Sequence, residues 1–257
     1  MAATAPQYDA VARDYERLIA PRYAVVAAAI LDALDLRADD AVLDIGAGTG
    51  GLARLILPRL GREGRLVLLD LSAGMLEVAR ERVSTDAPDA PSVELVVGDL
   101  TELPLETGAF SQVVAQFTPL QDSVPGISEA ARVLRPGGRL TVAYWGPAYR
   151  ELDLLNVVRA RVGIDPAVPP DRAAVIDRVA AAGFGSIEIA EHRFPSIYRD
   201  AEAYLAYRAA FGRAVAVDDE TWARYWAALA DEVRRMAADE GRIALDWSVE
   251  LLTAVRA

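Results

Sequence analysis

The chain has 257 residues, a formal net charge of −11, 27 basic residues that are all arginine, and no cysteine. This length allows one large domain with a core that needs no disulfide, and the missing cysteines and lysines exclude disulfides, thiolate metal sites, thiol nucleophiles and Schiff-base lysines. A negative field repels phosphate backbones, so we expect no nucleic-acid partner.

The start of the chain and the lengths of its apolar runs bear on location. Residues 1–18 lack a basic start followed by an apolar run, and no uncharged apolar run reaches the length of a membrane span. We therefore expect a cytoplasmic protein without membrane insertion. No metal-ligand spacing is found, so we expect no metal, and the sequence does not predict an oligomeric state.

Residues 5–36 have the apolar period of two helices. Apolar side chains recur at three- and four-residue steps at Tyr8, Val11, Tyr15, Leu18 and Ile19. Pro21 interrupts this pattern, and a second run follows over 23–36. We expect residues 1–38 to form an N-terminal helical cap.

Apolar runs then alternate with helical patterns. The expected strands are 41–46, 65–71, 93–100, 110–117 and 139–145. The expected helices are 49–60, 72–83 with Ser72 as its N-cap, and 124–134; 84–91 is expected to be a loop and 135–138 a turn. Such alternation predicts a parallel sheet covered by helices on both faces, so residues 39–147 form the expected core.

The pattern loosens after residue 147. A helix is expected over 149–161, a loop over 164–170, a helix capped by Asp171 that ends before Gly183, a strand over 186–194 and a closing strand over 243–257. Two aromatic-rich helices within 200–240 precede that closing strand. We expect them to form a substrate lid over about 198–241, within an acceptor-side half (148–257) of a single domain spanning 1–257.

The stretch VLDIGAGTGGLA (42–53) joins the first expected strand to its helix and can be read in two ways. Gly46, Gly48 and Gly51 spell G-x-G-x-x-G, the dinucleotide fingerprint, whereas Gly46, Gly48 and Gly50 spell G-x-G-x-G after an acidic strand end. Both readings bring the backbone close to a ligand. They predict different cofactors, so the choice depends on the surrounding residues.

Polar and aromatic side chains stand at or near the ends of the expected strands: Asp44, Asp70, Asp99, Gln116 and Trp145. Because parallel strands share one carboxyl-end rim, where ligands bind, we expect these side chains to converge. Asp70 follows the glycines by 19 to 24 residues, which suits a carboxylate that grips two ribose hydroxyls. Asp99 can accept a hydrogen bond from an exocyclic amine such as that of adenine.

The charge of this rim favours a cationic ligand. A carboxylate at Asp44 would repel a pyrophosphate placed over the glycine turn, but it would attract an ammonium group. S-adenosyl-L-methionine (SAM) carries both an ammonium and a sulfonium. The rim of acids therefore favours SAM over a dinucleotide.

Four motifs in order give the chain its family resemblance: VLDIGAGTG (42–50), LLDLSAGMLEVARERV (68–83), VVGDLTELPLETGAFSQVVAQF (96–117) and EAARVLRPGGRLTVAYWG (129–146). With them the chain resembles class I SAM-dependent methyltransferases, in particular the small-molecule branch that includes the ubiquinone/menaquinone-biosynthesis enzymes. The resemblance implies a Rossmann-like, seven-stranded, mostly parallel sheet whose last strand is antiparallel. It also implies methyl transfer from SAM to O, N or C of a small, apolar or aromatic acceptor.

The resemblance also assigns cofactor-binding residues. It implies that Gly46, Ala47 and Gly48 line the methionine part of SAM, with Asp44 near its ammonium. It implies that Asp70 holds the ribose, and that the adenine is flanked or held by Leu71, Met75, Asp99 and Leu100. Gln116 and Phe117 are expected beside the methionine moiety, and Tyr8 and Tyr15 are expected to fold over the cofactor.

The acceptor side is less defined by the sequence. Tyr144, Trp145 and Tyr149 follow the fifth strand, where acceptors lie in this fold, and are candidate substrate-binding residues. Many relatives carry a histidine after the fourth strand, but this chain has QFTPLQD (116–122) there. His192, its one histidine, is therefore the candidate catalytic base.

Two alternative functions remain open at this point. The SAM pocket could persist without methyl transfer, in a cyclase or a regulatory module, because a fold does not fix a function. The glycine-rich turn could instead serve an NAD-dependent oxidoreductase.

Overall fold

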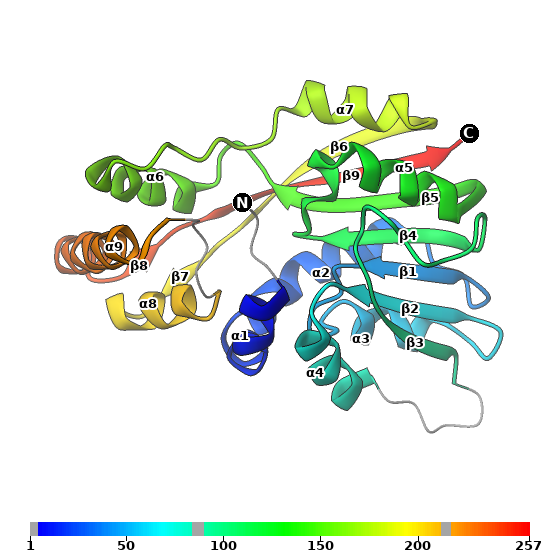
Figure 1. Ribbon diagram of the computed structural model, residues 1–257, viewed down its shortest axis with the longest axis horizontal. Helices are drawn as coiled ribbons and strands as arrows, with labels where there is room; N and C mark the ends of the chain where they lie inside the picture. The colour runs from blue at the N-terminus through cyan, green and yellow to red at the C-terminus, as the bar shows by residue number, and fades with distance from the viewer. Residues whose placement is uncertain (1–4, 84–89, 212–216) are drawn as a thin grey trace.

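The computed structural model describes residues 5–83, 90–211 and 217–257, and its centre is a seven-stranded sheet in the order β3-β2-β1-β4-β5-β9-β6 (Figure 1). The strands are β1 (Ala41–Ile45), β2 (Arg65–Asp70), β3 (Ser92–Val97), β4 (Phe110–Gln116), β5 (Leu134–Trp145), β6 (Phe184–Phe194) and β9 (Trp247–Arg256). β1 to β5 pair in parallel, and β9 runs antiparallel between β5 and β6. This order confirms the predicted fold, including the antiparallel last strand.

Helices cover both faces of the sheet. They are α1 (Ala5–Leu18), α2 (Ala20–Leu34), α3 (Ala53–Ile56), α4 (Ala73–Val83), α5 (Val124–Val133), α6 (Arg150–Val162), α7 (Arg172–Ala181), α8 (Ala201–Ala209) and α9 (Asp219–Glu240). One apolar cluster joins the sheet to α2, α3 and α4, and a second joins its opposite face to α5 and α7. Side chains of β1 and β4 are buried in both clusters, as continuous apolar runs in a covered parallel sheet require.

Two expected elements within residues 39–147 differ from those observed, and a third cannot be compared. The expected helix 49–60 is reduced to α3 followed by the short 3₁₀ helix η1 (Leu57–Arg59), because Pro58 cannot extend an α-helix. The expected turn at 135–138 lies within β5, but the pairing with β4 passes from Leu134 to Arg139, so these four residues bulge out. The loop expected over 84–91 falls mostly outside the described residues.

The expected closing strand is divided in two. Its first residues form β8 (Ile243–Ala244), which pairs with β7 (Ile197–Tyr198) in a separate two-stranded sheet. Only β9 joins the main sheet. Within the described ranges, no helix combines the length and the apolar character needed to cross a membrane.

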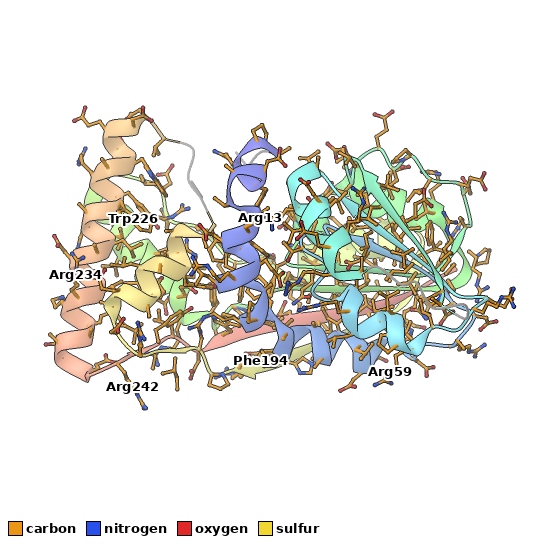
Figure 2. All side chains as sticks on the ribbon, turned by 90° about the horizontal axis from the view of Figure 1, so that it is seen from below. Arg13, Arg59, Phe194, Trp226, Arg234 and Arg242 are labelled. Atoms are coloured by element: carbon orange, nitrogen blue, oxygen red, sulfur yellow. The ribbon has the colours of Figure 1, made fainter. Side chains whose placement is uncertain are left out.

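The helices α6, α8 and α9 gather beyond one end of the sheet, and α1 lies between this group and α4 (Figures 1 and 2). The aromatic residues of α8 and α9 pack into the same apolar cluster as α2 and β9. At its centre lies Glu151, which is fully buried and accepts hydrogen bonds from Tyr204 Oη (2.9 Å) and Arg208 Nη1 (3.2 Å). Tyr149 Oη donates to its other oxygen (2.5 Å), so this carboxylate ties α6 to α8.

Candidate functional site

The backbone of the glycine-rich turn follows the G-x-G-x-G reading. Gly46, Gly48 and Gly50 all have positive φ (72°, 55° and 79°), whereas Gly51 does not. A Cβ at Gly46 would lie 1.8 Å from Thr118 Oγ1. The turn therefore needs glycine at these three positions, because other residues are strained in the left-handed region.

Gly48 and Gly50 face different surroundings. A Cβ at Gly50 would lie 3.3 Å from the Ala79 side chain, so this glycine lets the turn pack on α4. A Cβ at Gly48 would meet no atom of the described residues within 4 Å, so this glycine borders open space. The space beside Gly48 can admit a ligand against the backbone.

Asp70, at the end of β2, fastens the glycine turn to the start of α4. Its Oδ2 accepts a hydrogen bond from the backbone N–H of Gly48 (2.8 Å), and its Oδ1 accepts one from the backbone N–H of Ser72 (2.9 Å). Burial raises the pKa of this carboxyl, and the backbone hydrogen bonds oppose that rise. Each oxygen retains a further lone pair, so Asp70 can still accept from two hydroxyl groups.

Asp44 is a buried carboxylate with a free oxygen. Its side chain is 1% exposed, and its Oδ2 has no hydrogen-bond partner among the described residues. Burial, with a smaller contribution from the negative charge of Asp70, raises the pKa of Asp44 to about 7. A cationic ligand group would satisfy this oxygen and stabilise its charged form.

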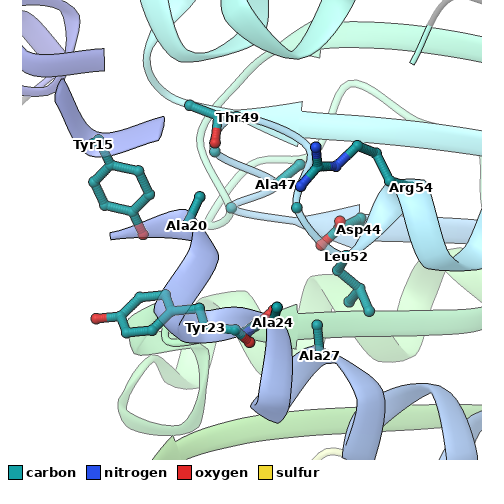
Figure 3. Close-up of a pocket in the computed structure, with 14 residues that line it drawn as sticks. Tyr15, Ala20, Tyr23, Ala24, Ala27, Asp44, Ala47, Thr49, Leu52 and Arg54 are labelled. Carbon is teal, nitrogen blue, oxygen red and sulfur yellow. The ribbon is translucent and has the colours of Figure 1, made fainter. Parts of the chain in front are cut away.

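A pocket surrounds this carboxylate, and we name it the glycine pocket (Figure 3). It is lined by Tyr15, Ala20, Tyr23, Ala24, Ala27, Asp44, Gly46, Ala47, Gly48, Thr49, Gly51, Leu52, Arg54 and Gln116. Tyr15 and Tyr23 flank one side, and Asp44 and Arg54 lie on the other. The glycine pocket thus joins an acidic centre to aromatic walls from α1 and α2.

Six residues expected at the cofactor lie in this lining: Tyr15, Asp44, Gly46, Ala47, Gly48 and Gln116. Sequence reasoning missed Tyr23, Thr49 and Arg54. Tyr23 comes just after Pro21, and in the sequence Pro21 indicates only a boundary between two helices. The backbone carbonyl of Tyr23 accepts a hydrogen bond from Gln116 Nε2 (3.1 Å). Thr49 and Arg54 lie within and just after the glycine motif, where only the glycines were assigned roles.

The residues expected around an adenine lie outside this lining. Leu71 is 46% exposed, and Met75 is buried against Ala12 and Val78 beneath α1. Asp99 and Leu100 follow β3, where Asp99 accepts hydrogen bonds from the Thr101 backbone and hydroxyl. These hydrogen bonds hold the pKa of the Asp99 carboxyl below its ordinary value. Their roles toward an adenine stay predictions.

Helix α1 is docked on the start of α4, next to these residues. Asp9 Oδ1 accepts hydrogen bonds from Ser72 Oγ (2.6 Å) and from the backbone N–H of Gly74 (2.8 Å). Tyr8, packed against the Met75 cluster, has its pKa raised by burial and by the charge of Asp70. Helix α1 thus brings Tyr8 close to Asp70, and the expected role of Tyr8 and Tyr15 over the cofactor stays a prediction.

A second pocket opens where β4 and β5 end, and we name it the strand-end pocket. It is lined by Phe117, Thr118, Pro119, Gln121, Asp122, Tyr144, Trp145, Tyr149, Leu152, Ala167, Val168, Pro169 and Pro170. All three residues expected to bind substrate, Tyr144, Trp145 and Tyr149, belong to it. The 164–170 loop was expected only as a connection, yet it supplies one wall.

Three stacked rings line the strand-end pocket. Phe117 stacks on Trp145 (centroids 4.0 Å apart, 16° between planes), and Trp145 stacks on Tyr149 (4.2 Å, 10°). Phe117 also contacts Tyr23 of the glycine pocket (4.6 Å). Its φ of 55° is uncommon for a non-glycine residue and marks a strained position. Phe117 therefore connects the linings of the two pockets through its contact with Tyr23.

The predicted base His192 is not brought to either pocket. It lies on β6, opposite Val249, and its ring is parallel to that of Phe194 at 6.2 Å. It is absent from both linings. The six aromatic residues of the expected lid are absent from them too: Tyr204, Tyr207, Phe211, Trp222, Tyr225 and Trp226. Their proposed roles stay predictions.

Comparison with known proteins adds sequence and fold relatives. A family model described as a methyltransferase domain matches residues 42–138. The ubiquinone/menaquinone biosynthesis C-methyltransferase UbiE of Neisseria meningitidis serogroup C is 30% identical over 174 residues, which are 60% of this chain and 70% of that protein. An uncharacterised 37.1 kDa protein of a Streptomyces fradiae transposon is 34% identical over 185 residues, covering 68% of this chain and 51% of that protein.

The fold has solved neighbours as well. A crystal structure of a putative methyltransferase from Bacillus halodurans matches with a TM-score of 0.63 and 20% identity, covering 90% of this chain and 98% of that one. The chain spans only about half of the transposon protein. The fold neighbour supports the architecture, and the curated relatives connect the sequence to a family.

Proposed function

This chain belongs to the class I SAM-dependent methyltransferases, a family of enzymes whose cofactor is SAM, and we propose that it methylates a small, largely apolar or aromatic molecule. The observation that carries this proposal is the ring contact between Phe117, which lines the strand-end pocket, and Tyr23, which lines the glycine pocket. The glycine pocket is acidic and built on a glycine turn, and the strand-end pocket is walled by aromatic rings. A methyl donor in the first and an acceptor in the second would meet at that contact.

The residues present fit SAM. Asp44 has a buried carboxylate oxygen without a partner among the described residues, and a Cβ at Gly48 would meet none of their atoms within 4 Å. Asp44 would hold the ammonium, Asp70 the ribose hydroxyls, and Tyr15 and Tyr23 would cover the ligand. When bound, SAM supplies a methyl group already activated by its sulfonium.

The protein's own contribution is alignment and exclusion of water. In-line methyl transfer needs the acceptor atom held against the methyl carbon, and such positioning accounts for much of the acceleration in bimolecular reactions. The ring stack of Phe117, Trp145 and Tyr149 supplies a rigid apolar wall for that purpose. We further propose that the acceptor is not a nucleic acid and that the enzyme works in the cytoplasm, since its charge is −11 and it has no cysteine.

Methyl transfer from isotope-labelled SAM to a panel of small hydroxylated, amino and unsaturated aromatic compounds tests this function. We expect label in the organic extract with at least one compound. The Asp44→Asn variant is the loss-of-function control. His192→Gln tests the predicted base: loss of turnover in this variant would support the base, and unchanged turnover would exclude it. Saturable SAM binding without label transfer across the panel would overturn the proposal in favour of a SAM-binding protein without methyl transfer.

A further inference from the structure

Two residues that line the strand-end pocket carry buried polar atoms without partners in the described part of the chain. Gln121 Oε1 and Tyr144 Oη lack hydrogen-bond partners among the described residues, and both residues line the pocket. Gln121 is 7% exposed and Tyr144 is 2% exposed. Native proteins rarely leave such atoms unsatisfied, so each calls for an explanation.

Gln121 presents its amide oxygen as a free acceptor. Its Nε2 donates to Asp122 Oδ2 (2.8 Å), which orients the amide and leaves Oε1 as the free atom. Its backbone carbonyl accepts from Arg178 Nε (3.0 Å), and Arg178 Nη2 also contacts Asp122 (3.3 Å). The segment from Pro119 to Asp122 is thereby held in place.

Tyr144 also presents an acceptor, because a carboxylate lies behind it. Tyr144 and Glu250 are direct partners on β5 and β9. Glu250 is 1% exposed; its Oε1 accepts from Arg172 Nε (2.8 Å), while its Oε2 has no partner within the described ranges. Burial and the neighbouring Glu250 raise the pKa of Tyr144, so its hydroxyl keeps its proton. The free Glu250 Oε2 can accept that proton, which would leave the lone pairs of the phenolic oxygen for a ligand in the pocket that Tyr144 lines.

We propose that Gln121 and Tyr144 together bind a hydrogen-bond donor of the acceptor molecule, a hydroxyl or a neutral N–H group. Glu250 is the positioning residue that keeps Tyr144 in its accepting orientation. The apolar body of the acceptor then lies along Trp145 and the Pro169-Pro170 wall. This inference rests on the proposed function, since it specifies the substrate class of the same site.

The same arrangement excludes an anion at this position. Gln121 Oε1, the Tyr144 oxygen and the Asp122 carboxylate all present electron pairs. The two neighbouring guanidinium groups are already engaged, Arg178 with Asp122 and Arg172 with Glu250. A carboxylate or phosphate there would face these oxygens and the negative charge of Asp122, so the enzyme should discriminate against such acceptors.

Binding of three matched probes tests this selectivity: 4-phenylphenol, 4-methoxybiphenyl and biphenyl-4-carboxylate, each titrated into the full-length protein saturated with S-adenosylhomocysteine. We expect the phenol to bind about tenfold or more tightly than the ether, because the buried acceptors are satisfied only by a donor. The carboxylate should bind most weakly. Tyr144→Phe and Gln121→Leu should each reduce the preference for the phenol over the ether several-fold.

Glu250→Gln separates a positioning role from a structural one. Arg172 would hold the new amide oxygen, leaving the amide N–H toward Tyr144, so the Tyr144 proton would turn to the pocket. The ratio of the affinities for the phenol and the ether should then fall, whereas a structural defect would weaken the binding of both probes equally. Tyr198→Phe alters a buried tyrosine that lines neither pocket and should leave the preference unchanged.

Three results would overturn the inference. The wild-type protein could fail to bind the phenol, or it could bind the phenol no more tightly than the ether. The third result is a preference for the phenol that stays the same in both Tyr144→Phe and Gln121→Leu. Binding of S-adenosylhomocysteine is measured first for every variant. A wild-type protein that does not bind S-adenosylhomocysteine would count against the proposed function itself. If Tyr144→Phe does not fold, Gln121→Leu decides the outcome, because Gln121 lies on the short 3₁₀ helix η2 (Pro119–Asp122) rather than in the sheet.

Discussion

Asp44→Asn is the substitution whose consequences follow most directly from the structure, because it removes a buried charge while keeping the shape of the side chain. The carboxyl holds its proton up to about pH 7 in the folded protein, against an ordinary pKa of 3.8. The folded state therefore binds more protons than the unfolded state between these values. Stability should fall as pH rises through this window and be constant outside it.

The magnitude follows from the pKa. A rise from 3.8 to about 7 corresponds to an upper bound of about 4 kcal/mol, at about 1.4 kcal/mol per pH unit. The neutral amide of the Asp44→Asn variant would carry no such cost at any pH. The variant should thus be more stable than the wild type without cofactor by up to about 4 kcal/mol at pH 8, by less than half of that at pH 5, and not at all below pH 3.8.

Urea unfolding at several pH values measures this difference, and titration with SAM measures its functional counterpart. Wild-type affinity for SAM should rise about tenfold from pH 6 to above pH 7 as Asp44 becomes ionised, whereas the variant should show no such rise. Losing a buried charge pair should cost the variant about a hundredfold or more in affinity at pH 7.5. Equal stability of the two proteins at pH 8, or equal affinity, would refute this reasoning.

Five further substitutions separate local roles. Gly46→Ala should unfold the protein or destabilise it by several kcal/mol, because the new Cβ would lie 1.8 Å from the hydroxyl oxygen of Thr118. Gly48→Ala should lower the free energy of unfolding by only about 1 to 2 kcal/mol but should weaken SAM binding. Urea unfolding measures the first effect, and calorimetric titration with SAM measures the second. Glu151→Leu should cost about 3 to 5 kcal/mol, because Arg208 loses its buried partner, and Glu151→Gln should cost less by the same unfolding assay. Asp9→Ala should speed hydrogen exchange in α1 and leave exchange in α9 unchanged. Equal exchange of α1 in the variant and the wild type would show that the hydrogen bonds of Asp9 to Ser72 and Gly74 do not hold α1 in place.

The glycine turn shows what sequence reasoning could and could not resolve. The alternation of strands and helices predicted the sheet, and strand ends predicted where Asp44 and Asp70 lie. The two glycine spellings differ only between Gly50 and Gly51, and backbone angles distinguish them: Gly50 has positive φ and Gly51 does not. Charge at Asp44 had already favoured the same answer.

His192 shows the opposite case. Its strand was predicted, but the position of that strand in the sheet depends on long-range pairing. β9 inserts between β5 and β6 and moves β6 to the sheet edge, away from both pockets. The wall of Phe117, Trp145 and Tyr149 likewise joins residues far apart in sequence, and only their packing revealed one continuous stack.

Calorimetric titration of the wild-type protein with SAM and, separately, with NAD⁺ at about pH 7.5 tests the central claim most directly, because Asp44 is then mostly ionised. The wild-type protein should bind SAM saturably and should not bind NAD⁺, and Asp44→Asn should bind SAM about a hundredfold or more weakly. Binding of NAD⁺ without binding of SAM would contradict the central claim.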